Sequence, residues 1–143
     1  MFIGEYNYSM DEKRRLAVPA KFRKKLGNSA VITQSVVDFC LVLHPIKEWE
    51  KKSEKLQNMP EASGARGIVR LVLSGASDVS FDKLGRILIP EYLKKYAKLK
   101  KNITVIGIGN RIEIWSEDNW QEYKEKTAKE IGNIAEKLEE LGI

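Results

Sequence analysis

The chain has 143 residues, which suits one compact domain or two very small ones, and its content of 43% hydrophobic and 31% charged residues predicts a soluble globular protein. No apolar run approaches the roughly 18 residues that a membrane-spanning helix needs, and the N-terminus lacks the layout of a secretory signal, so we expect a cytoplasmic protein. The single cysteine, Cys40, excludes an internal disulfide.

The formal net charge is +5, and the positive charge is concentrated in two segments. Residues 1–25 hold seven Lys and Arg against three Asp and Glu, and residues 82–101 hold seven against two, so the rest of the chain is net negative. Two interpretations remain open at this point. The segments are either solvated, lysine-rich helix faces or a surface for a polyanion.

The first half of the chain predicts a short series of elements. Residues 2–10 alternate as a strand, with Phe2, Tyr6, Tyr8 and Met10 on one face. A basic turn, "DEKRR" at 11–15, leads into an apolar strand. Pro19 then favours the start of a short basic helix. A hairpin over 30–44 and a helix over 45–56 complete the half, and a short helix within 61–76 connects it to the second half.

The second half repeats this order. The turn "DKLGR" at 82–86 leads into "ILI", Pro90 precedes a basic helix, and "ITVIGIGNRIEIW" at 103–115 predicts a hairpin whose turn contains Gly109. A final helix over 116–141 carries the apolar residues Ile131, Ile134, Leu138 and Leu141 on one stripe. That stripe predicts a helix that packs on the core or, alternatively, one that contacts another subunit.

The two halves align without a gap at an offset of 71 residues. Identical or similar residues meet at many positions, among them Asp11 with Asp82, Arg15 with Arg86, Pro19 with Pro90 and Trp49 with Trp120. We conclude that the chain is a tandem duplication and that each half is a structural unit. The recurring Trp49 and Trp120 are expected to anchor the core.

The two turns are the candidate contact sites. Arg15 and Arg86 carry planar guanidinium groups that suit phosphate or the O6/N7 edge of guanine. The neighbouring cations Lys13, Arg14 and Lys83 suit phosphate, whereas Asp11 and Asp82 are expected to organise the turns through hydrogen bonds to the backbone or to the arginines. The plainer alternative for the arginines is surface solvation or a local ion pair.

The paired turns, "RLVLSGA" at 70–76 and "GNRIEIW" at 109–115 together resemble the MraZ family of bacterial transcriptional regulators, within the SpoVT-AbrB superfamily. The resemblance implies an α+β fold, a swapped-hairpin β-barrel of the AbrB type in which both half-barrels come from one chain, with flanking helices. It divides the chain into repeats at 5–47 and 76–119, connecting helices at 48–75 and a C-terminal helix at 120–143.

The resemblance also implies a function. The expected protein is a nucleoid-associated, ring-forming homo-oligomer that presents the basic turns to double-stranded DNA, binds direct repeats in the promoter of its own division and cell-wall operon and represses it. One residue departs from the family motif, which has glycine before the turn arginine. The second turn has this glycine, Gly85, but the first turn has Arg14 in its place. Arg14 is therefore either strained by about 1 kcal/mol at a positive φ or part of a different turn that gains a cation.

Other functions are less well supported by the residues. One Cys and one His cannot build a usual zinc site, and "GIGNR" leads into a strand, unlike a dinucleotide-binding loop. We expect no enzyme activity, metal, cofactor, small-molecule substrate or membrane, with His44 and Cys40 structural. The alternative function is a ring-forming scaffold that binds protein and not specific DNA.

Overall fold

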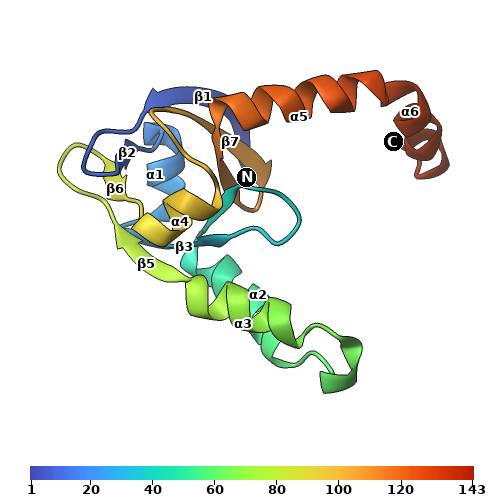
Figure 1. Ribbon diagram of the computed structural model, residues 1–143, viewed down its shortest axis with the longest axis horizontal. Coiled ribbons are helices and arrows are strands. Elements are labelled where there is room, and N and C mark those ends of the chain that lie inside the picture. Colours follow the sequence, from blue (N-terminus) through green and yellow to red (C-terminus); the bar gives the residue numbers. More distant parts are fainter.

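The computed structural model describes residues 1–143 except the side chain of Ser63, and it shows an α+β protein with a mostly antiparallel sheet (Figure 1). The first half contains β1 (Phe2–Ser9), β2 (Arg15–Ala17), α1 (Ala20–Leu26), β3 (Ser29–Gln34), β4 (Leu41–His44) and α2 (Ile46–Gln57). The connector contains the 3-10 helix η1 (Glu61–Ser63) and α3 (Arg66–Gly75). The second half contains β5 (Ser77–Ser80), β6 (Arg86–Leu88), α4 (Glu91–Tyr96), β7 (Asn102–Gly109), β8 (Ile112–Ser116), α5 (Glu117–Lys129) and α6 (Ile131–Glu140).

The two halves exchange their first strands. The main sheet has the order β1-β7-β8-β4-β3-β5, so β1 of the first half pairs with β7 of the second, and β5 of the second half pairs with β3 of the first. The hairpins β3–β4 and β7–β8 meet in the middle of the sheet, where β4 pairs with β8. Neither half could therefore form this sheet without the other.

A second, two-stranded antiparallel sheet joins β2 to β6, and we call it the β2–β6 ribbon. Leu16 lies opposite Ile87 in this ribbon, and both side chains are almost completely buried. Because side chains alternate between the faces of a strand, the flanking Arg15 and Arg86 are directed to the outer face. The ribbon thus buries one apolar face and displays a basic one.

The core lies between the strands and the two short basic helices. In β1, Phe2 is buried and Tyr6 and Tyr8 are half-buried, as the alternation predicts. Phe2 and Tyr6 both pack edge-on against Phe22 of α1, with ring centroids 5.5 and 5.4 Å apart. The aromatic cluster fixes α1 against the exchanged strand.

The closed barrel implied by the resemblance is not confirmed. Among the described residues, β1 and β5 are the two outer strands of the six-stranded sheet, and β2 and β6 pair with each other without joining it. The sheet therefore has two edges. The interlocked pairing of the two halves and the α+β class are present, but in an open sheet with a separate ribbon.

The sequence predicts one long C-terminal helix, whereas the structure contains two. Helix α5 ends at Lys129 and α6 begins at Ile131 (Figure 1). None of the residues of α6 is buried, and Ile131 and Leu141 are 62% and 73% exposed. The apolar stripe therefore does not pack on the core of the chain.

The recurring tryptophans occupy related places at the margin of the core. Trp49 lies 5.6 Å from the ring of His44, and Trp120 lies 5.3 Å from the ring of Trp115, which is the counterpart of His44 in the repeat. Both are half-buried, so they anchor α2 and α5 to the sheet without being fully enclosed. No helix within the described part of the chain is long and apolar enough to cross a membrane.

Candidate nucleic-acid interface

The Asp11 carboxylate accepts three hydrogen bonds within the first turn. Its Oδ1 accepts from the backbone N–H groups of Lys13 and Arg15, at 3.0 and 2.8 Å, and its Oδ2 accepts from Nε of Arg15 at 2.6 Å. The backbone closes the turn as well, because the N–H of Arg14 donates to the carbonyl of Asp11 at 3.0 Å. The carboxylate therefore holds both the loop backbone and the arginine side chain.

The second turn repeats this arrangement with Asp82. Its Oδ1 accepts from the N–H groups of Leu84 and Arg86, both at 2.9 Å, and its Oδ2 accepts from Nε of Arg86 at 2.8 Å. The N–H of Gly85 donates to the carbonyl of Asp82 at 3.0 Å. The two loops thus have the same pattern of hydrogen bonds, although the residues at their tips differ.

These bonds lower the pKa of both carboxyl groups. The largest cause is the backbone N–H of Arg15 for Asp11 and that of Arg86 for Asp82, each of which donates to the charged form. The arginine side chains add hydrogen bonding and Coulomb attraction in the same direction, and partial desolvation opposes them. Both carboxylates are therefore ionised at neutral pH.

Arg14 adopts the same left-handed backbone as Gly85, with φ values of 61° and 75°. The first turn is thus not a different turn, and the arginine carries the cost of a left-handed conformation. Its side chain is not a free cation, because Nε donates to the carbonyl of Ile89 at 2.9 Å and Nη1 lies 3.3 Å from Glu91. The structure therefore uses Arg14 to join the first turn to the second half.

Arg23 of α1 fills the matching place beside the second turn. Its Nε donates to the carbonyl of Val18 at 3.1 Å, and Val18 is the repeat counterpart of Ile89. A Cβ on Gly85 would lie 2.5 Å from Nη1 of Arg23. Each of the two carbonyls thus accepts a hydrogen bond from an arginine. The arginine at Val18 belongs to helix α1, whereas the arginine at Ile89 belongs to the first turn.

Sequence reasoning missed Arg23, although a signal for it exists in the repeat. The counterpart of Arg23 is Lys94, and the counterpart of Gly85 is Arg14. Where the helix supplies arginine the turn has glycine, and where the helix supplies lysine the turn has arginine. In each half-pair the arginine stands either in the helix or in the turn, which indicates that the two side chains would occupy the same space.

The structure brings the two turns together at the β2–β6 ribbon, and Figure 1 shows both loops at the same end of the molecule. The antiparallel register places Arg15 opposite Leu88 and Arg86 opposite Ala17, so both arginines lie on the outer face. Nη1 of Arg86 also lies 3.7 Å from Oδ2 of Asp11, which links the turns. Lys13 and Lys83 are exposed at the two tips.

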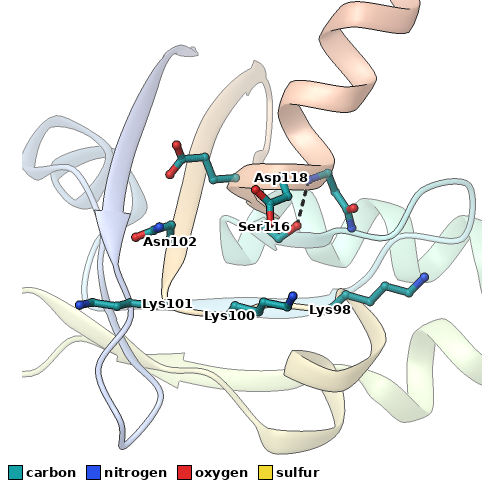
Figure 2. A pocket seen from close by; sticks show the side chains of 8 residues that line it. Lys98, Lys100, Lys101, Asn102, Ser116 and Asp118 are labelled. Atoms are coloured by element: carbon teal, nitrogen blue, oxygen red, sulfur yellow. Dashed lines mark hydrogen bonds between the residues drawn. The ribbon is translucent and has the colours of Figure 1, made fainter.

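A third group of cations does not belong to either turn. Lys98, Lys100 and Lys101 line a cavity of about 400 Å³ with the start of α5 (Figure 2). Glu117 and Asp118 lie across that cavity, and Ser116 caps α5 by accepting a hydrogen bond from the N–H of Asn119 at 3.1 Å. The carboxylates oppose the lysines here, so the cavity is a weaker candidate for a polyanion than the ribbon.

The two residues considered for catalysis are both buried. Cys40 has no exposed surface, and burial raises the pKa of its thiol to about 12, which keeps it protonated. His44 is 4% exposed, and burial is the main cause that lowers its pKa to about 4. Among the described side chains, no group of three or more His, Cys, Asp or Glu could hold a metal ion.

These observations define the class: an internally duplicated α+β protein whose halves exchange strands and display paired, aspartate-braced basic turns on a common ribbon. A family model described as "MraZ protein, putative antitoxin-like" matches residues 1–70 and again residues 72–140. The chain belongs to the MraZ family.

Relatives of the chain agree with this assignment over its full length. Proteins named "Transcriptional regulator MraZ" from Clostridium tetani, Clostridium acetobutylicum and Oenococcus oeni are 47%, 46% and 46% identical to it over 144 aligned positions. In each case the alignment covers 100% of both chains.

Proposed function

We propose that this protein is a DNA-binding transcriptional regulator that contacts double-stranded DNA through the outer face of the β2–β6 ribbon and its two turns. The observation that carries the proposal is the placement of Arg15 and Arg86 together on that face, each braced through Nε by its own aspartate. Bracing reduces the conformational freedom that a contact residue loses on binding. The names of the relatives support the regulatory role.

The shape of the ribbon suits the major groove, which admits a two-stranded antiparallel ribbon. Among the side-chain hydrogen bonds of the described residues, the guanidinium of Arg15 donates only through Nε, so its two terminal nitrogens are available for a base edge or a phosphate. Lys13 and Lys83 extend the positive charge at the tips. Arg14 acts as a support for the first turn, since its guanidinium is engaged with Ile89 and Glu91.

A single pair of turns gives limited affinity, so we propose a closed homo-oligomeric ring that presents many turns to direct repeats in a promoter. Linked sites raise avidity by roughly 10² to 10⁴ when they bind together. The exposed apolar residues of α6 support its role as a subunit contact. The family resemblance suggests that the protein occupies the nucleoid and represses its own division and cell-wall operon, and the interlocked halves fit a swapped-hairpin unit of the AbrB type.

The test is a gel-shift titration with the promoter of its own operon, using the double variant Arg15→Ala/Arg86→Ala. We expect at least a hundredfold loss of affinity, since two hydrogen-bonded charges of about 1.5–3 kcal/mol each are removed. The matched control is Arg66→Ala/Arg70→Ala, which removes the same charge from exposed positions of α3.

Unchanged affinity of the ribbon variant, with fold and oligomeric mass intact, would contradict the proposed DNA interface. If the wild-type protein assembles but is not retained on heparin or DNA at moderate salt, the scaffold function is the better description.

A further inference from the structure

A recessed, positively charged cavity lies between α2 and the β7–β8 turn. It measures about 310 Å³, within the usual range for small-ligand sites, and is lined by His44, Glu48, Lys51, Lys52, Lys55 and Arg111, with Asn110 at the turn. Four cationic side chains therefore face one carboxylate. Figure 1 shows α2 away from the β2–β6 ribbon, so this cavity is separate from the proposed DNA interface.

The local ion pairs leave part of this charge unbalanced. Lys51 lies 3.4 Å from Glu48, and Arg111 lies 3.3 Å from Glu113. Within the described part of the chain, no carboxylate oxygen lies within 4.0 Å of Lys52 or Lys55. Burial is the main cause that lowers the pKa of Lys52, the nearby Arg111 lowers it further, and Glu113 partly opposes both effects. The site thus contains a half-buried cation beside another cation, an arrangement that an anion would relieve.

His44 is a second unsatisfied group in the wall of the cavity. Its Nε2 is buried and has no hydrogen-bond partner among the described atoms. Leaving a buried polar atom unpaired costs about 1–3 kcal/mol. The imidazole is held in place by the ring of Trp49 at 5.6 Å, so it is part of a formed wall and not a mobile surface residue.

The repeat provides an internal comparison for this cavity. The counterparts of His44, Lys51 and Lys52 in the second half are Trp115, Glu122 and Tyr123. Trp115 and Tyr123 pack against each other with ring centroids 5.2 Å apart. In the second half, aromatic rings therefore fill the place that is open and positively charged in the first half. The duplicated fold by itself does not require a cavity at this position.

We propose that this cavity binds a small phosphate-bearing anion, with Lys52 and Arg111 as the main charged ligands. Phosphate oxygens accept hydrogen bonds from both ammonium and guanidinium groups. The size of the cavity admits a diphosphate or a similar multivalent oxyanion. A compact ligand fits better than a DNA backbone because Lys52 is half-buried.

The experiment is a titration of the wild-type protein with inorganic pyrophosphate at neutral pH, in the absence of DNA. His44 is the only histidine, so its imidazole C2–H resonance reports on the cavity without further assignment. We expect a saturable shift of this resonance that sodium chloride at equal ionic strength does not reproduce. Calorimetry of the same titration gives the dissociation constant.

Three variants test the assignment by calorimetry. Lys52→Met keeps the apolar stem and removes the charge, and it should weaken pyrophosphate binding about tenfold or more. His44→Trp/Lys52→Tyr installs the residues of the second half and should abolish binding. Lys126→Ala, the control, removes a cation that is already paired with Glu122 at 3.4 Å and should leave binding unchanged.

Absence of a saturable shift in the wild type, or equal affinity of wild type and Lys52→Met, would overturn the proposal. The proposal would also be overturned if the protein did not bind pyrophosphate and Lys52→Met abolished DNA binding, because the cavity would then bind the DNA backbone. The gel-shift test of the ribbon is independent of these outcomes, because it uses other residues and another ligand.

Discussion

At the scale of single residues, the two turns show how one backbone shape is kept with different side chains. Arg14 and Gly85 share a left-handed conformation that costs an L-residue roughly 1–2 kcal/mol. Glycine avoids that cost and leaves room for Arg23, whereas Arg14 recovers part of it through the carbonyl of Ile89 and the carboxylate of Glu91. The sequence difference between the turns is therefore a local compensation.

Gly85→Ala should destabilise the protein by about 1–3 kcal/mol, because the new methyl group occupies the place of the Arg23 guanidinium at a positive φ. The free energy of unfolding in urea measures this loss. In an Arg23→Ala background the same substitution should cost less, since only the backbone strain remains. Equal costs in the two backgrounds would show that the two residues do not share this space.

The two turn aspartates predict a defined response to acid. Their pKa values in the folded protein are lowered from the ordinary value of 3.8, so their bonds stabilise the fold above that pH. This contribution is lost as the pH falls below 3.8 toward the folded pKa values. Carboxyl carbon resonances of Asp11 and Asp82 should titrate with midpoints below 3.8, and Asp82→Asn should reduce the acid dependence of stability. Midpoints at or above the ordinary value would contradict the hydrogen bonds described.

Among the secondary-structure elements, the pairing of β1 with β7 depends on close backbone packing. Gly107 of β7 lies opposite Gly4 of β1, and a Cβ at Gly107 would lie 2.5 Å from the backbone nitrogen of Ile3. Backbone atoms of a paired strand cannot move aside cheaply. This glycine therefore permits the first half of the chain to reach the second.

Gly107→Ala should accordingly lower the free energy of unfolding by about 1–3 kcal/mol, as expected when a methyl group is forced into a packed site. Chemical denaturation followed by circular dichroism provides the measurement. Gly132→Ala is the matched control, because nothing lies within 4 Å of that position, and it should be neutral or slightly stabilising. Equal effects of the two substitutions would argue against the close packing of β1 on β7.

Across the molecule, two of the positively charged surfaces differ in shape. The β2–β6 ribbon displays Arg15 and Arg86 with the tip lysines, and the cavity beside α2 gathers Lys51, Lys52, Lys55 and Arg111. The first surface is open and suits a long polyanion, whereas the second is recessed and suits a small one. The mild overall charge of +5 conceals this difference.

The affinity for DNA should fall steeply with salt concentration, with a log–log slope near −0.9 for each phosphate neutralised. Arg15→Ala/Arg86→Ala should make the slope shallower by about 0.9 for each phosphate that the variant no longer neutralises, as measured by fluorescence anisotropy between low and physiological salt. Arg66→Ala/Arg70→Ala should leave the slope unchanged. The same slope for all three proteins would place the phosphate-binding residues elsewhere.

The duplication, the order of the elements up to α5 and the positions of both basic turns could be predicted from the sequence, because these features are local or periodic. The alternation of Phe2, Tyr6 and Tyr8 and the matched aspartates and arginines at an offset of 71 residues can be read without coordinates. The sequence also placed Cys40 in an apolar segment, where burial keeps its thiol neutral.

The folded chain was needed to show which strands pair and that the sheet is open. It was also needed to show that the last helix breaks after Lys129 and that Arg14 and Arg23 cap matching carbonyls. The cavity beside α2 belongs to the same group, since its residues come from both halves of the chain. The strand pairing, the two caps and the cavity depend on interactions between residues distant in sequence, and periodicity carries no information about such partners. The break after Lys129 is different, because no residue of α6 is buried against the core.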